Sequence, residues 1–157
     1  MKKEETVDYH IKVVWHAISR MYNQGAAMKG ITASSGFVLL NIDTEHGTPA
    51  TKIAPMLGME SRSLTRMLKS MEESGLIYRE RDETDKRTVL IKLTPEGRAK
   101  RDFSRRAVIY FNELVRRNVP DDKLKAFFDV METINQMIED NRNFDQNIQR
   151  IENETSN

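Results

Sequence analysis

The residues best suited to chemistry lie on one side of a segment near the middle of the chain. Within residues 61–74, apolar side chains recur at a helical spacing of three and four, at Leu64, Met67, Leu68 and Met71. The cations of this segment project from the opposite side of that helix, and they are Arg62, Arg66 and Lys69. Hydroxyl groups stand beside them, on Ser63, Thr65 and Ser70. Arginine pairs with guanine through two hydrogen bonds, hydroxyls bond bases or phosphates, and a helix fits the DNA major groove, so this face is predicted to contact DNA.

A second cationic cluster follows at the tip of an expected hairpin, over residues 82–87. Arg81, Lys86 and Arg87 stand there among acidic residues. A basic hairpin tip can enter a minor groove, where the potential of DNA is most negative. Asp85 stands two residues before Arg87, and we expect its carboxylate to hold the Arg87 guanidinium in a charge-assisted pair. The alternative interpretation is that both clusters are ordinary solvent-exposed charges, which keep an outer helix face and a turn soluble and bind nothing.

Several helices are predicted to position these clusters. Residues 7–21 carry an apolar stripe at steps of four and three, which indicates a first helix of about twenty residues. Thr32 or Ser34 can cap a second helix, which Gly47 stops. The cationic helix itself runs from about residue 61 to 74 and is ended by Gly75.

The third helix, over about residues 48–57, is short and has two candidate starts. Thr48 with Pro49 is one, and Thr51 is the other. Pro55 deep inside a helix would remove a hydrogen bond and cost ~3 kcal/mol. The start at Thr51, which leaves Pro55 near the first turn, is therefore the less strained interpretation.

After the cationic helix, two short strands are predicted at residues 76–81 and 88–93. Thr94 with Pro95 begins a fifth helix, and Pro120 with Asp121 or Asp122 begins a sixth. The tail still shows helical spacing, at Phe144, Ile148 and Ile151. A short helix, a turn, a longer helix and a hairpin form a winged helix-turn-helix, so we predict a mainly α protein with about six helices and a small β-hairpin wing.

Composition excludes several classes of function. The 157 residues fit a single-domain subunit, and they contain no Cys for a disulfide, a thiolate metal site or a thiol sensor. The three histidines, His10, His16 and His46, do not cluster, so we expect no metal and no cofactor. No phosphate-binding loop or nucleophile motif indicates an enzyme. No apolar run approaches the ~18 residues of a membrane span, which predicts a cytoplasmic protein without a membrane partner.

Residues 57–97 resemble the MarR family of bacterial and archaeal winged-helix regulators. The matching pieces are Leu57-Gly58, Ser63 to Arg66, Gly75-Leu76-Ile77, Asp85-Lys86-Arg87 and Leu93-Thr94-Pro95-Glu96-Gly97. The resemblance implies a DNA-binding lobe over about residues 32–96, with dimerisation helices over about residues 5–28 and 97–142. It also implies a homodimer on a pseudo-palindromic operator, with repression as the more common role.

The chain departs from the family pattern at the start of the recognition helix. Many members have Ser-Pro there, whereas this chain has Glu60 and Ser61. An acid at that point would repel phosphate. Pro55 in the short third helix is also unusual for the family.

The resemblance further implies a small-molecule effector that binds between the dimer platform and the lobe and releases DNA. The candidate contacts on the first helix are Trp15, His16 and Tyr22. The alternative is that aromatic residues on a long amphipathic helix belong to the core or to the dimer interface. A different class of function is also open, in which the winged helix binds a protein partner in place of DNA.

Overall fold

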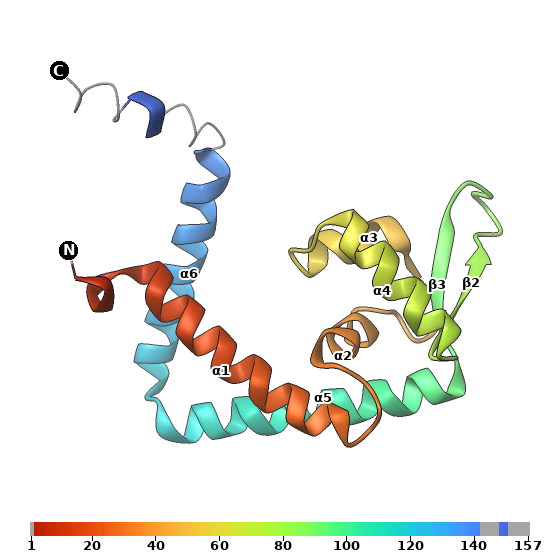
Figure 1. The fold of residues 1–157 in the computed structure, drawn as a ribbon, viewed down its shortest axis with the longest axis horizontal. Coiled ribbons are helices and arrows are strands. Elements are labelled where there is room, and N and C mark those ends of the chain that lie inside the picture. The colour runs from red at the N-terminus through yellow and green to blue at the C-terminus, as the bar shows by residue number, and fades with distance from the viewer. Residues whose placement is uncertain (1, 142–147, 151–157) are drawn as a thin grey trace. The chain divides into compact units, whose positions relative to one another are not determined.

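The structure is a computed structural model that describes residues 2–141 and 148–150. Its elements, shown in Figure 1, are a 3-10 helix (Lys3–Glu5), α1 (Val7–Ala27), α2 (Ala33–Leu40), β1 (Thr48–Pro49), α3 (Ala50–Met56), α4 (Ser61–Glu73), β2 (Ile77–Arg81), β3 (Val89–Leu93), α5 (Pro95–Asn118) and α6 (Asp121–Asp140). The chain divides into two compact units, Met1–Tyr110 and Phe111–Asn157, and the boundary falls within α5. The predicted fold class, mainly α with a small wing, is confirmed.

The two predicted strands form an antiparallel hairpin. Ile77 stands opposite Leu93 and Arg81 opposite Val89, so the pairing extends over the full length of both strands. A third strand, β1, pairs with the other edge of β3 through Thr48 and Ile91, which gives the strand order β1-β3-β2. The sequence did not indicate β1, because two residues that include a proline carry no periodicity.

The third helix differs from the favoured prediction. It begins at Ala50, after the N-cap Pro49, and Pro55 lies inside its last turn. Thr48 caps no helix, since its hydroxyl accepts from the Asp43 amide at 2.9 Å and donates to the Asn41 carbonyl at 3.2 Å. The helix tolerates Pro55 because it has only seven residues, so few hydrogen bonds depend on that position. The carbonyl groups at its C-terminal end accept hydrogen bonds from later amides, as Ala54 O does from Met59 N at 3.0 Å.

The core of the first unit fixes the orientation of α4. Its apolar stripe faces inward, with Leu64, Leu68 and Met71 each at most 3% exposed. They join a buried cluster from α2, α3 and the sheet whose most enclosed members are Val38, Leu39, Ile42, Ile53, Ile77 and Ile91. Each such side chain contributes about 1.5–3 kcal/mol relative to exposure. The predicted inward face of α4 is therefore confirmed.

A tight junction joins the end of α4 to the start of α5. Gly75 ends α4 in the left-handed region, at φ +69°, and Leu76 N then bonds Met71 O at 2.9 Å. The Thr94 hydroxyl donates to Gly75 O at 2.6 Å and accepts from the Gly97 amide at 3.0 Å, which caps α5 as predicted. Gly97 packs so closely that a Cβ there would overlap the Leu76 carbonyl oxygen.

The second unit contains the end of α5 and all of α6. The predicted sixth helix is present as α6, and Leu124 is its buried residue. Phe127, Phe128 and Ile138 are each at least half exposed. Among the residues that the structure describes, no helix is long and apolar enough to cross a membrane. Of the tail residues expected at helical spacing, Ile148 lies in a short helical stretch, whereas Phe144 and Ile151 lie outside the described residues.

We predict that Gly97→Ala lowers the free energy of unfolding by about 1–3 kcal/mol or more, because the added methyl group meets a backbone carbonyl that cannot move without shifting β2. Urea unfolding followed by circular dichroism measures the change. Gly25→Ala is the matched control, since nothing lies within 4 Å of a Cβ at that helical position. It should raise stability by about 0.5–1 kcal/mol. Equal stability of the two variants would show that the junction is not tight.

Candidate nucleic-acid interface

The outer face of α4 carries the predicted cations in exposed positions. Arg62, Arg66 and Lys69 are all exposed, on the side opposite the buried stripe. Lys69 pairs with Glu73 one turn later, at 3.9 Å between Nζ and Oε1. Among the residues that the structure describes, no carboxylate lies within 4.0 Å of Arg62 or Arg66. These two guanidinium groups therefore remain available as paired donors to an external anion or base.

The three hydroxyl candidates of α4 are not equivalent. Ser63 is exposed near the start of the helix, whereas the Thr65 hydroxyl donates to the Ser61 carbonyl at 2.8 Å. Ser70 lies on the flank, where it lines a groove with Ser74 and Lys29 from the turn after α1. Ser63 is thus the hydroxyl best placed beside the free arginines, and Ser70 is displaced from them.

The start of α4 has no side-chain cap. Glu60 is its N-cap residue in an extended conformation, with φ −67° and ψ 139°, and its side chain makes no capping hydrogen bond. Only its backbone takes part, as Glu60 O accepts from Leu64 N at 3.1 Å. The first amides of α4 therefore lack the partner that a short polar cap would supply.

The tip of the β2–β3 hairpin is folded by its own acidic side chains. The Asp82 carboxylate accepts from the Thr84 amide at 2.8 Å, the Thr84 hydroxyl at 2.6 Å and the Asp85 amide at 2.9 Å. These bonds hold the pKa of Asp82 below its ordinary value, with the Thr84 hydroxyl as the largest cause, followed by the two amides.

Asp85 does not act as we expected. Its carboxylate accepts from the Arg87 backbone amide at 3.1 Å and from the Thr88 hydroxyl at 2.9 Å, and it forms no ion pair with the Arg87 guanidinium. A short acidic side chain in a turn reaches the amide two residues on more easily than the end of a long side chain. In the part of the chain that the structure describes, the cations of the tip have no carboxylate within 4.0 Å, and they are Arg81, Lys86 and Arg87.

Two ion pairs that the sequence did not indicate brace the hairpin. Arg79 of β2 donates from Nε to Glu72 of α4 at 3.0 Å, which ties the hairpin to α4. Lys92 of β3 donates to Glu80 of β2 at 2.8 Å, and this bond raises the pKa of Lys92. Neither pair has a local sequence signal, because each joins residues from different elements.

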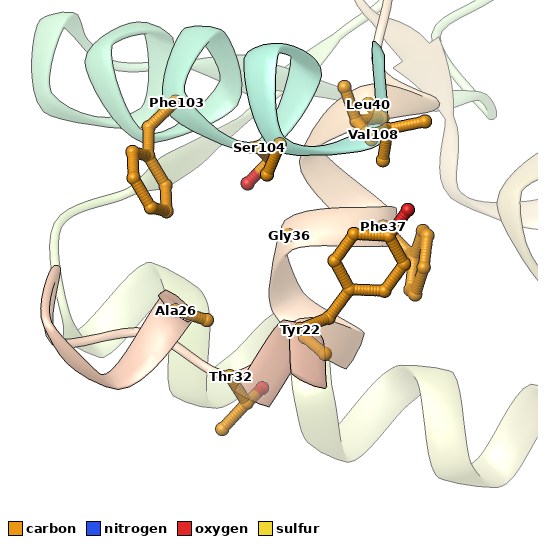
Figure 2. Close-up of a pocket in the computed structure, with 11 residues that line it drawn as sticks. Tyr22, Ala26, Thr32, Gly36, Phe37, Leu40, Phe103, Ser104 and Val108 are labelled. Carbon is orange, nitrogen blue, oxygen red and sulfur yellow. The ribbon is translucent and has the colours of Figure 1, made fainter. Parts of the chain in front are cut away.

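Of the three effector candidates, Tyr22 lines a cavity in the described part of the chain. The cavity lies between α1, α2 and α5, and its wall includes Phe37, Gly36 and Ser104 (Figure 2). The Tyr22 and Phe37 rings meet edge to face at 5.6 Å between centroids, and burial raises the pKa of Tyr22. The Trp15 ring lies near Phe37, at 6.3 Å between ring centroids. The exposed His16 does not contribute to the wall.

The cavity is small. Its volume is about 20 Å³, which is room for about one water molecule. Drug-sized ligands occupy roughly 300–1,000 Å³. Most of the wall comes from α2 and α5, outside the helix on which the effector contacts were expected, and includes Ala33, Leu40, Phe103, Ala107 and Val108.

Comparison with known proteins places the lobe in a well-defined group. Residues 31–89 match the MarR family model. The chain is 39% identical over 83 residues to the HTH-type transcriptional regulator TtmR of Methylorubrum extorquens, covering 53% of this chain and 43% of that protein. It is 33% identical over 97 residues to the organic hydroperoxide resistance transcriptional regulator of Bacillus subtilis, covering 62% and 66%. The match thus spans less than two thirds of each of these relatives.

Two solved structures of CouR have the same fold. The transcriptional repressor CouR bound to a 23-mer DNA duplex is 26% identical, with a TM-score of 0.69, and the match covers 83% of this chain and 93% of that one. CouR from Rhodococcus jostii RHA1 bound to p-coumaroyl-CoA is 22% identical, with a TM-score of 0.76 and coverage of 85% and 94%. The likeness covers most of the chain and extends beyond the matched lobe.

We predict that the wing tip keeps its shape at neutral pH and loosens only in acid. A carboxyl group with a lowered pKa stabilises the fold above its unfolded pKa, and that stability is lost as the pH falls through its folded pKa. For Asp82 the loss should come below pH 3.8, its ordinary value. A carboxyl-carbon NMR titration and amide exchange at Thr84 and Asp85 measure it. Asp82→Ala, which removes the acceptor oxygen, should exchange faster than the wild type at neutral pH, and a wild-type midpoint at or above 3.8 would contradict the prediction.

Proposed function

This chain belongs to the MarR family, and from that premise we propose that it is a transcriptional regulator that binds double-stranded DNA sequence-specifically. The observation that carries the proposal is the set of free cations on adjacent surfaces. Arg62 and Arg66 on α4, with Arg81, Lys86 and Arg87 on the wing, are exposed and have no carboxylate partner among the described residues. The DNA-bound CouR structure gives the same fold a nucleic-acid partner.

In this proposal α4 enters the major groove, and the wing reaches the adjacent minor groove. The free guanidinium groups of Arg62 and Arg66 suit the O6 and N7 acceptors of guanine. The cations of the tip suit the negative potential of a narrow minor groove. The Arg79–Glu72 pair between β2 and α4 would then hold the two contacts at a fixed spacing.

We further propose that the regulator is a homodimer. Apolar side chains are exposed along α1, at Val7, Ile11 and Val14, and along α6, at Phe127, Phe128 and Ile138. Water disfavours apolar surfaces of this extent, and a second copy of the chain would cover them. Two recognition helices related by a two-fold axis would read a pseudo-palindromic operator with half-sites about one turn apart, roughly 10 base pairs.

Repression with release by a small molecule completes the proposal. A dimer on a promoter blocks polymerase without further parts. The cavity beside Tyr22 and Phe37 is the candidate effector site, with Trp15 at its margin and an aromatic wall that suits an aromatic or amphipathic acid. It must widen before it can hold such a ligand. The Bacillus subtilis relative is named for organic hydroperoxide resistance, but this chain has no Cys to oxidise.

The test is a fluorescence titration of the protein against the DNA upstream of its own gene, with a scrambled competitor and a salt series. Saturable binding that resists the competitor and weakens steeply with salt supports the regulator, because phosphate contacts release counterions. Weak binding that the competitor removes would favour a winged helix that binds a protein partner.

We predict that Arg87→Ala weakens DNA binding by about ten- to hundredfold, because it removes a charged hydrogen-bond donor from the wing. Arg62→Ala and Arg66→Ala should instead change which base is preferred in the half-site. Arg106→Ala, which removes one exposed charge from α5, is the control and should have little effect. Unchanged affinity in Arg87→Ala and unchanged preference in both α4 variants would remove the DNA-binding interpretation.

We predict that the protein sediments as a dimer at micromolar concentration. Val14→Glu should raise the dissociation constant by about tenfold or more, because a two-fold interface presents each buried charge twice. Analytical ultracentrifugation over a concentration series measures the change. Lys12→Glu adds an acid to an exposed polar position of the same helix and is the control. A wild-type protein that sediments as a stable monomer would refute the dimer.

A further inference from the structure

Glu60 is not one of the residues that usually cap a helix, although it occupies the N-cap position of α4. Ser, Thr, Asp and Asn are the residues that stabilise a helix N-terminus, because their short side chains reach the first free amides. Glu60 occupies that position and makes no such bond. Positions where a sequence violates local preference without a structural gain are commonly functional.

Glu60 also differs from the other acidic residues of α4. Glu72 is paired with Arg79 at 3.0 Å, and Glu73 is paired with Lys69 at 3.9 Å. Within residues 2–141 and 148–150, no cation lies within 4.0 Å of the Glu60 carboxylate. Glu60 is exposed, so its carboxylate is free to bond an external donor.

The free Glu60 carboxylate at the start of α4 limits which groups of DNA it can contact. It only accepts hydrogen bonds and is repelled by phosphate, so a contact with the DNA backbone is unfavourable. The N-terminal residues of a recognition helix are the ones that meet base edges. In the major groove the donors are the amino groups of cytosine N4 and adenine N6. Adenine places its own N7 acceptor beside N6, which repels a carboxylate, whereas cytosine places a C5–H group there and its N4 is the group that Glu and Asp side chains recognise.

We propose that Glu60 is a specificity-determining residue whose carboxylate accepts a hydrogen bond from the N4 amino group of a cytosine in the major groove. This inference rests on the proposed function. The arginines of α4 suit guanine, and Glu60 would add a contact with cytosine. The half-site would then contain both a guanine contact and a cytosine contact.

The experiment selects bound sequences from a random DNA library with the full-length protein and compares variants at Glu60. The wild type should prefer cytosine at one half-site position by on the order of tenfold over thymine. Glu60→Gln should move that preference to adenine, because a side-chain amide pairs with both N6 and N7. Glu60→Ser should lose the preference there and raise the Tm by roughly 2–4 °C, since serine supplies the missing cap.

Glu73→Gln is the matched control, because it removes one negative charge from the same helix away from its N-terminus. It should leave every base preference unchanged. The inference is overturned if Glu60→Gln and Glu73→Gln have the same effect, a uniform change in affinity with the wild-type base preferences intact. A wild type that selects no sequence from the library would overturn the proposed function together with this inference. A wild type that selects a site without the cytosine overturns only the inference.

Discussion

The burial of one side of α4 is the constraint on which the rest of the interface depends. Leu64, Leu68 and Met71 lie in the core of the lobe, and each helps to anchor the helix by about 1.5–3 kcal/mol. A helix pinned on one side must present its other side to solvent, and that side carries Arg62 and Arg66. The junction through Gly75, Thr94 and Gly97 then fixes where α4 ends, so both the rotation and the position of the cationic face follow from apolar packing.

The charges of the lobe are divided between structure and surface. Several acidic side chains bond within the fold: Glu72 and Glu80 pair with Arg79 and Lys92, and Asp82 and Asp85 of the wing tip accept amide and hydroxyl hydrogen bonds. Among the residues that the structure describes, Lys69 is the one cation of the tip and the outer face of α4 with a carboxylate partner. The chain as a whole has a formal net charge of only +1, so what distinguishes these cations is that their side chains can bond an external anion.

Periodicity explains what the sequence could predict. The stripe of α4 repeats over enough residues to identify a helix and its buried side, and it appears in the structure as expected. Strand β1 is too short to repeat anything. Asp85 and the brace between Arg79 and Glu72 escaped prediction for another reason: spacing places residues near each other, but it does not decide whether a carboxylate bonds an amide or a guanidinium. Trp15, His16 and Tyr22 all lie on the first helix, so their spacing did not show which of them lines the cavity. Tyr22 does so because α2 and α5 pack around its side of the helix.

The closeness of α2 and α5 has a mechanical consequence. Gly36 meets α5 with so little clearance that a Cβ there would come within 2.8 Å of the Ser104 hydroxyl oxygen, and the cavity lies at this contact. A molecule that enters would act as a wedge, because it must move α2 away from α5. The same short helix contributes Val38 and Leu39 to the core that holds α4, so the wedge cannot act locally. A ligand would bind there only if its binding free energy exceeded the cost of disturbing this packing.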